Sequence, residues 1–393
     1  MTPLTQSPKD PEFVQNPYPF YEAARANGPF FHWTDYGMPC TGNATAVNAI
    51  FRDRRFGREA PPENAFAIAP HTAAFYAVEA HSMLELEPPR HTRLRSLVLR
   101  AFTTRRIAAL GPEIAALTHQ LIDAFPSGGF DLLPHFATKI PVIIIARLLG
   151  VPEAMAPDLL RWSNAMVGMY IAGRARDAED RATAATEAFT TFLRAYIDAR
   201  RARPADDLIT HLIAAEAEGE RLTTDELIST CILLLNAGHE ATVHTIGNGV
   251  KTLLQTATPH AALAPDAVEQ TVEEILRFDP ALHMFTRWAY EDVTVMGHTF
   301  HRGDRVALLL AAANRDPANW PDPARFDPTR PIKPHASFGA GLHFCVGAPL
   351  ARLELQVAVP ILFQRLPGLH LTETPHYADV YHFHGLNCLM VAR

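Results

Sequence analysis

The chain has 393 residues, of which 48% are hydrophobic and 20% are charged, and its formal net charge is -7. This composition supplies material for a large apolar core and indicates a soluble globular protein. The chain has no polybasic character, so nucleic acid is not an expected partner.

The amino-terminal segment and the cysteines indicate the cellular compartment of the protein. The first 30 residues contain prolines and acidic residues where a signal peptide would have a basic start and an apolar stretch. The longest apolar run, residues 140–150, is interrupted by Arg147 and is too short to cross a bilayer. The 4 cysteines show no C-x-x-C pair and no metal-ligand spacing. We therefore expect a cytoplasmic protein with neither a disulfide framework nor a zinc site.

Periodicity in the sequence indicates the fold class. Alanine and leucine at helical spacing dominate residues 104–256. Strand-like alternation follows in residues 292–300 and 305–311, on either side of a turn, and two further segments at the carboxyl end, 369–372 and 386–391, extend this β character. The expected fold is mainly α with a minor β region.

Two expected helices carry paired polar side chains. His91 and Arg95 are four residues apart, so one helix face presents both. Glu274 and Arg277 are three residues apart in the helical segment 267–278 and can form an ion pair. Each pair has an ordinary alternative, because solvated charges at these spacings are common on protein surfaces.

A long helix is expected over about residues 224–255. It contains the run N-A-G-H-E-A-T at residues 236–242. Glycine in a helix interior costs about 1 kcal/mol relative to alanine, so Gly238 indicates that another group approaches closely. Thr245 lies one turn beyond Ala241 and shares its face. The alternative for Thr242 and Thr245 is a hydrogen bond from each hydroxyl to a carbonyl of the preceding turn.

Near the carboxyl end, Cys345 lies in the run F-G-A-G-L-H-F-C-V-G at residues 338–347. Gly339 and Gly341 permit turn conformations, and Gly347 leaves no side chain where a flat ring would approach. The helix expected next places its positive N-terminal end beside the sulfur, which favours a thiolate. The alternative for an isolated cysteine is a buried thiol in a glycine-rich turn.

This run matches the haem-binding loop pattern F-G-x-G-x-H-x-C-x-G of the cytochrome P450 family, and the chain resembles that family over nearly its whole length. The resemblance implies one domain over residues 1–393 with the family's triangular-prism fold. Its α-rich body would span about 90–280 and 340–366, and its small β regions about 290–312 and 369–393. The implied cofactor is haem b, with Cys345 as the axial iron ligand and with loop contacts from Phe338, Gly339 and Gly347.

The resemblance also assigns residues around the haem. The family positions that bind the haem propionates are matched by His91, Arg95, Arg287 and His343. Glu274 and Arg277 match a pair that joins a third residue, here Arg330, in a network bracing the proximal side.

The run at residues 236–242 resembles the oxygen-binding motif A-G-x-(E/D)-T-(T/S), with Ala237 and Gly238 beside the distal face and Glu240 in the acid position. The sequence departs from the motif at Ala241, where the family has threonine. That missing hydroxyl would hold a water and favour productive O–O cleavage over release of hydrogen peroxide. Thr242 points elsewhere because one residue turns a helix by about 100 degrees. We expect Thr245, an ordered water or a substrate hydroxyl to supply the proton route.

The implied substrate space is largely apolar and suits a small, moderately hydrophobic organic molecule. Asn236 and His283 are its possible polar contacts. The residues expected to line it, each with core packing as the alternative, are Phe75, Met166, Met169, Leu233, Asn236, His283, Phe285 and His384.

The implied activity is monooxygenation with O2. The sequence contains no flavin or iron-sulfur segment, so we expect a separate ferredoxin and its NAD(P)H-dependent reductase to supply electrons. Such donors are acidic, and the candidate docking cations are Arg100, Arg105, Arg106, Lys333 and Arg352. A peroxide-using peroxygenase and a non-enzymatic haem sensor are the alternatives, and the acid at Glu240 argues against both.

Overall fold

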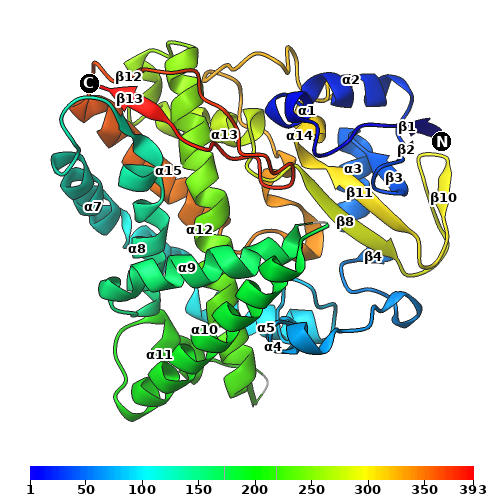
Figure 1. Ribbon diagram of the computed structural model, residues 1–393, viewed down its shortest axis with the longest axis horizontal. Coiled ribbons are helices and arrows are strands. Elements are labelled where there is room, and N and C mark those ends of the chain that lie inside the picture. The colour runs from blue at the N-terminus through cyan, green and yellow to red at the C-terminus, as the bar shows by residue number, and fades with distance from the viewer. Residues whose placement is uncertain (172, 218) are drawn as a thin grey trace. The chain divides into compact units, whose positions relative to one another are not determined.

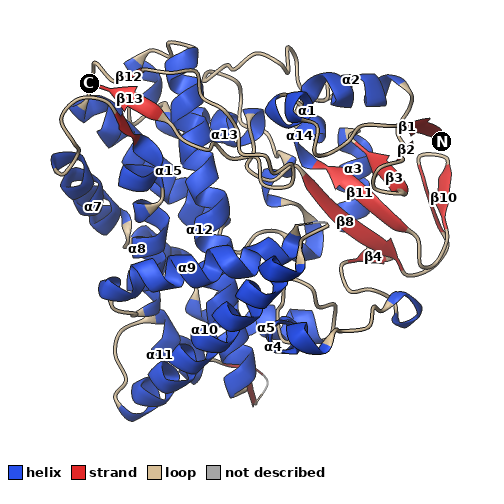
Figure 2. Ribbon diagram, in the orientation of Figure 1, coloured by secondary structure: helices blue, strands red, loops and turns tan. Residues whose placement is uncertain are grey.

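Residues 1–171, 173–217 and 219–393 are described by a computed structural model in which helices predominate over short strands (Figure 1). The chain forms two compact units. The first contains residues 1–64, 115–137 and 241–393, and the second contains residues 65–114 and 138–240. The expectation of a mainly α fold with a minor β region is confirmed, as the colouring in Figure 2 makes plain.

The α-helices are α1 (Pro11–Gln15), α2 (Tyr18–Ala26), α3 (Ala44–Arg52), α4 (Ala73–Glu79), α5 (Arg90–Ala101), α6 (Thr104–Ala108), α7 (Gly111–Asp123), α8 (Lys139–Leu149), α9 (Ala156–Val167), α10 (Arg176–Ala202), α11 (Leu208–Ala214), α12 (Thr224–Gln255), α13 (Val268–Phe278), α14 (Leu310–Ala313) and α15 (Ala348–Arg365). The strands are β1 (Thr2–Leu4), β2 (Phe31–Trp33), β3 (Met38–Thr41), β4 (Phe56–Gly57), β5 (Phe130–Asp131), β6 (Glu216–Ala217), β7 (Glu220–Arg221), β8 (Met284–Ala289), β9 (Val293–Val295), β10 (His298–Phe300), β11 (Arg305–Leu309), β12 (His370–Leu371) and β13 (Met390–Ala392).

The largest sheet belongs to the first unit and has the strand order β1-β2-β3-β11-β8-β4. Its central strand β11 pairs antiparallel with β8 and parallel with β3. Residues 306–309 of β11 are all buried, as expected for a strand covered on both faces. Periodicity predicted β11 but neither β8 nor the amino-terminal strands. Burial along β8 does not alternate strictly, and the amino-terminal strands have only two to four residues.

The segment 292–300 is a hairpin, so its prediction as one strand is wrong. β9 and β10 pair antiparallel, with Val295 opposite His298. Met296 and Gly297 form the turn with φ values of 46° and 80°. Two consecutive left-handed residues give the tight turn that matches strand twist.

Helix α12 has the bounds that the sequence predicted, residues 224–255, and α13 begins one residue later than expected. The carboxyl-terminal β character is also confirmed, because β12 and β13 form a small sheet with β5. Among the helices of the described ranges, none has both the length and the apolar character that a bilayer crossing needs.

Candidate functional site

The loop before α15 holds Cys345 in a fixed turn. The Cys345 N–H donates to the carbonyl of Phe338 at 3.0 Å, which closes the loop on itself. Gly341 has a φ of +68°, and a Cβ there would lie 2.1 Å from the carbonyl oxygen of Phe51. Any side chain at that position would force the loop away from α3, so glycine is required for this geometry.

The Cys345 side chain is half-buried and belongs to no disulfide. A Cβ on Gly347 would lie 3.8 Å from Sγ, in ordinary van der Waals contact. Glycine therefore places no side chain beside the sulfur at this position. Helix α15 begins at Ala348 with a proline in its first turn, so its N-terminal end follows the sulfur closely and favours a thiolate. These features fit the flat, sulfur-ligated cofactor that the sequence predicts.

Other predicted cofactor residues of the first unit lie on the large sheet and in the same loop. Arg287 is on β8 and is 3% exposed. Its guanidinium donates to the Thr286 carbonyl at 2.8 Å and lies 4.9 Å from the centroid of the Phe51 ring. His343 ends the short turn before Cys345 and is half-buried. The first unit thus offers a permanent cation and an imidazole near the loop.

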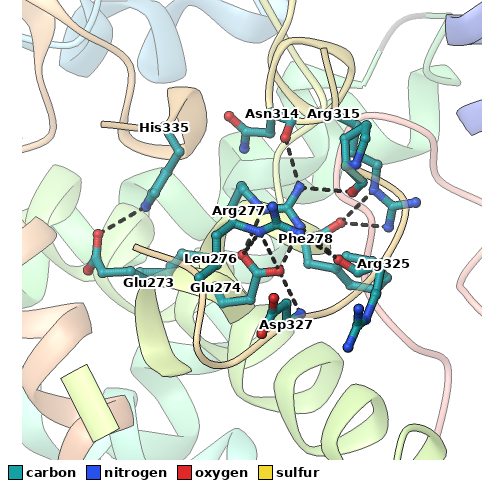
Figure 3. Close-up of polar contacts among 12 residues, drawn as sticks. Glu273, Glu274, Leu276, Arg277, Phe278, Asn314, Arg315, Arg325, Asp327 and His335 are labelled. Atoms are coloured by element: carbon teal, nitrogen blue, oxygen red, sulfur yellow. Dashed lines mark hydrogen bonds and ion pairs between the residues drawn. The ribbon is translucent and has the colours of Figure 1, made fainter. Parts of the chain in front are cut away.

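Glu274 and Arg277 form a buried ion pair on α13, with side chains at most 2% exposed (Figure 3). Two bonds of 2.7 Å join the guanidinium to the two carboxylate oxygens. Arg330 approaches both oxygens at 3.2 Å, and the Asp327 N–H donates to Oε1 at 2.9 Å. The structure therefore brings the three predicted network residues together.

The same network reaches the chain leading to the cysteine loop. Arg277 donates to the carbonyl of Asn314 at 2.9 Å, and the Asn314 amide oxygen accepts from the Ala336 N–H at 2.6 Å. The Ser337 hydroxyl donates to the Leu276 carbonyl at 2.7 Å. Helix α13 is thereby fastened to the residues just before Phe338.

Glu273 is a second acidic residue of α13 that the sequence analysis missed. Its carboxylate accepts from Arg352 on α15 at 2.5 and 2.9 Å and lies 3.3 Å from His335. Burial alone would raise its pKa, but the bonds to Arg352 and His335 outweigh burial and lower the pKa from 4.5 to about 2. Glu273 therefore links α13 to the segment that precedes Cys345, through His335, and to the helix that follows it, through Arg352. Its position beside Glu274 was the only signal in the sequence.

Helix α12 carries the run that resembles the oxygen-binding motif. A Cβ on Gly238 would meet Ile145 of α8 at 3.5 Å, so the group that approaches this glycine includes a packed aliphatic side chain. Glu240 and Ala241 are half-buried, and Ala237 is exposed. The Thr245 hydroxyl donates to the Ala241 carbonyl at 2.7 Å. That is the backward hydrogen bond given above as the alternative for Thr245, and Thr242 is buried.

In the second unit, Asn236 of α12 lies against Met166 of α9, with Nδ2 3.8 Å from Sδ. Asn236 is 6% exposed, and its Oδ1 has no hydrogen-bond partner among the described residues. Met169 and Phe75 are also buried, and Leu233 is half-buried. On α5, His91 is buried and Arg95 is half-buried. Asn236 is thus an unsatisfied polar group in an apolar setting.

Two predicted substrate residues instead lie in a buried polar cluster of the first unit. His283 Nδ1 is 2.9 Å from the hydroxyl of Tyr21, and His384 Nε2 is 3.5 Å from Asp279. Both histidines are therefore packed in the protein core, which is the alternative given for them in the sequence analysis. Phe285 of β8 is half-buried, with the Arg58 guanidinium 5.4 Å from its ring centroid.

Comparisons with known proteins agree with this arrangement. The family model described as Cytochrome P450 matches residues 266–373, the stretch that contains the Glu274 network and Cys345. The chain is 37% identical over 380 residues to the Cytochrome P450 monooxygenase PikC of Streptomyces venezuelae, which covers 93% of this chain and 87% of that protein. It is 35% identical over 399 residues to the Biotin biosynthesis cytochrome P450 of Bacillus subtilis, with 99% of each chain covered.

Among solved structures, P450BioI in complex with hexadec-9Z-enoic acid ligated acyl carrier protein matches with a TM-score of 0.90 at 34% identity, covering 97% of this chain and 99% of that chain. The similarity in sequence and fold extends over almost the entire length. This chain therefore belongs to the cytochrome P450 family.

Proposed function

We propose that this chain, an oxidoreductase of the P450 monooxygenase class, holds haem b through Cys345 and inserts one atom of O2 into a small, moderately hydrophobic molecule. The observation that carries the proposal is the environment of Cys345. Cys345 is half-buried, Gly347 places no side chain beside its sulfur, and the cysteine lies just before the start of α15. A cysteine thiolate donates electron density to haem iron and favours O–O cleavage.

In this proposal, the chain's own residues bind and hold the cofactor. Arg287 and His343 of the first unit would pair with haem propionates, because buried carboxylates need cationic or donor partners. The same role for His91 and Arg95 of the second unit stays a prediction from the sequence. The networks of Glu274 and Glu273 keep the cysteine loop in place through the contacts of α13 with Asn314, Ser337 and Arg352. Their role is positioning.

Glu240 holds the proton that the reaction consumes, and it lies half-buried on α12. The proton of the Thr245 hydroxyl is already donated to the Ala241 carbonyl. Of the three proposed routes, an ordered water and a substrate hydroxyl therefore remain better supported than Thr245.

Asn236 supports a substrate with a hydrogen-bond donor. A buried acceptor without a partner costs about 1–3 kcal/mol, and Asn236 Oδ1 is such an acceptor among the described residues. A hydroxyl or N–H group on an otherwise apolar substrate would satisfy it. The buried Met166 beside it suits an apolar skeleton.

A ferredoxin and its NAD(P)H-dependent reductase are the proposed electron source. The chain's formal net charge is negative, so an acidic donor protein would bind only where cations are concentrated locally on the surface. Of the predicted docking residues, Arg100, Arg105 and Lys333 are exposed and are the best supported, because Arg106 is paired with Asp206 and Arg352 with Glu273.

The test is the spectrum of the reduced carbon monoxide adduct. We expect the red-shifted thiolate band in the wild type, its loss in Cys345→Ser, and its retention in the control Cys388→Ser, which changes another half-buried cysteine. Retention of the band in Cys345→Ser would overturn the ligand assignment. Steady turnover with hydrogen peroxide and none with reduced ferredoxin would replace the monooxygenase proposal by the peroxygenase alternative.

A further inference from the structure

A second group of metal-binding side chain types lies in the first unit, in the cluster formed by Asp279, His283 and His384. Asp279 directly follows α13, His283 directly precedes β8, and His384 comes from the carboxyl-terminal segment. One ligand atom from each lies within 4.8 Å of the others. The three side chains are between 0% and 3% exposed. Asp279 and His283, four residues apart in the chain, and His384 from the carboxyl-terminal segment thus place donor atoms close together in the protein interior.

Each of the three side chains has a buried polar atom without a hydrogen-bond partner among the described residues. These atoms are Asp279 Oδ1, His283 Nε2 and His384 Nδ1, and the other ring nitrogen of His384, Nε2, lies 3.5 Å from Asp279 Oδ1. Buried polar groups are normally satisfied, and leaving one unpaired costs about 1–3 kcal/mol. Three in one cluster indicate that the site takes up a further group.

The remaining atoms of two of these side chains are already oriented by protein contacts. The hydroxyl of Tyr21 is 2.9 Å from His283 Nδ1 and hydrogen-bonds to Tyr381 at 2.8 Å. Lys251 donates to Asp279 Oδ2 at 2.7 Å, and the Tyr377 hydroxyl donates to the same oxygen. His283 Nε2 and Asp279 Oδ1 are left for a ligand, with the outer-shell contacts that fix ligand orientation in metal sites.

The protonation states suit coordination. Burial lowers the pKa of His384 to about 4 and holds the pKa of His283 well below its ordinary range. Burial would raise the pKa of Asp279, but the charge of Lys251 outweighs it and holds that pKa low. Neutral imidazoles and an ionised carboxylate are the forms in which these side chains bind metal ions.

We propose that Asp279, His283 and His384 form a binding site for a borderline divalent cation, with Zn²⁺ as the biological candidate. Two nitrogens and one carboxylate oxygen are a donor set that Zn²⁺ accepts at about 2.0–2.2 Å, with water in a fourth position. The donor atoms lie within 4.8 Å of one another, so small side-chain movements can bring all three to bonding distance of one ion. Calcium and magnesium prefer sites built from oxygen ligands.

Lys251 sets the affinity of this site. Its ammonium is 10% exposed and 2.7 Å from the carboxylate that would ligate the cation. Like charges in a buried site repel strongly, so the lysine weakens binding even though it orients the carboxylate. Replacing Lys251 with an uncharged residue of similar length should strengthen zinc binding, which is an unusual outcome for the loss of a buried ion-pair partner.

Equilibrium dialysis of the holoenzyme against ZnCl2, followed by elemental analysis for zinc and iron, tests the site. We expect one zinc per chain, affinity at least about tenfold weaker in His283→Gln and His384→Gln, and tighter binding in Lys251→Met. His301→Gln, which removes an exposed histidine paired with Asp292, is the matched control and should bind as the wild type does.

A zinc-dependent rise in melting temperature, larger in Lys251→Met than in wild type, is the second measurement and does not rely on the histidine variants folding. Absence of zinc from both wild type and Lys251→Met, or unchanged binding in the His283→Gln/His384→Gln double variant, would overturn the site. Neither readout uses the carbon monoxide spectrum, so failure here is distinct from failure of the Cys345 assignment.

Discussion

At the scale of single residues, the proposed proton route depends on what Ala241 and Thr245 can supply. Ala241 lacks the hydroxyl that the family motif supplies, and the Thr245 hydroxyl is committed to the Ala241 carbonyl at 2.7 Å. A hydroxyl that donates to a helix carbonyl satisfies the backbone and is poorly placed to relay a proton.

We therefore expect Thr245→Val, which keeps the shape, to change the ratio of product to hydrogen peroxide by less than about twofold, or ~0.4 kcal/mol. Ala241→Thr should lower peroxide release by at least about threefold, or ~0.7 kcal/mol. The measurement is NADH, product and peroxide balance with one substrate. A large increase in peroxide from Thr245→Val would restore Thr245 to the proton route.

At the scale of elements, α13 is the helix that fastens the cysteine loop. Its consecutive residues Glu273 and Glu274 point into two different networks, one to Arg352 and one to Arg277 and Arg330. Adjacent residues on a helix are turned by about 100 degrees, which is why one short helix can bind both the segment before Phe338 and the helix after Cys345.

The lowered pKa of Glu273 predicts a pH dependence of stability. Because the pKa is lower in the folded state, at about 2 against 4.5, this carboxylate contributes stability above about pH 4.5 and loses it as the pH falls toward 2. Urea unfolding midpoints between pH 7 and pH 3 should fall more steeply for wild type than for Glu273→Gln. At pH 7 the variant should be less stable by about 2 kcal/mol. If the unfolding midpoints of wild type and Glu273→Gln fall in parallel as the pH is lowered, ionisation of Glu273 is not coupled to folding.

At the scale of the whole molecule, the net charge of -7 opposes an acidic electron donor. Attraction then depends on local cations, and the rate of association should fall as salt screens them. Lys333 is exposed, and its amine donates to the Asn319 carbonyl at 3.1 Å and lies 5.8 Å from the centroid of the Trp320 ring.

Lys333→Glu should slow reduction by an acidic ferredoxin by about threefold at low salt and flatten its salt dependence. Lys9→Glu, at another exposed lysine, makes the same change in net charge and should have little effect. Stopped-flow reduction at several salt concentrations distinguishes the two. Equal slowing in both variants would mean that total charge, and no local surface at Lys333, controls the rate.

The sequence alone determined the fold class, the bounds of α12, those of α13 to within one residue, and the family, because each rests on a long period or on several specified residues close together. The single domain over residues 1–393 stays a prediction. The amino-terminal strands were not predicted because they have only two to four residues, and β8 was not predicted because burial along it does not alternate strictly. Pairing across the sheet holds these strands in place, and only the folded chain supplies that pairing.

Tertiary structure also decided which polar residues belong together. The sequence identified Glu274 and Arg277 by their spacing but missed Glu273, whose partners lie 62 and 79 residues away at His335 and Arg352. The sequence shows no ligand spacing typical of zinc sites. The residues of the proposed zinc site, Asp279, His283 and His384, meet only when the carboxyl-terminal segment packs against the end of α13. Interactions between neighbouring residues can be predicted from the sequence, whereas a site assembled from distant segments forms only when burial brings those segments into contact.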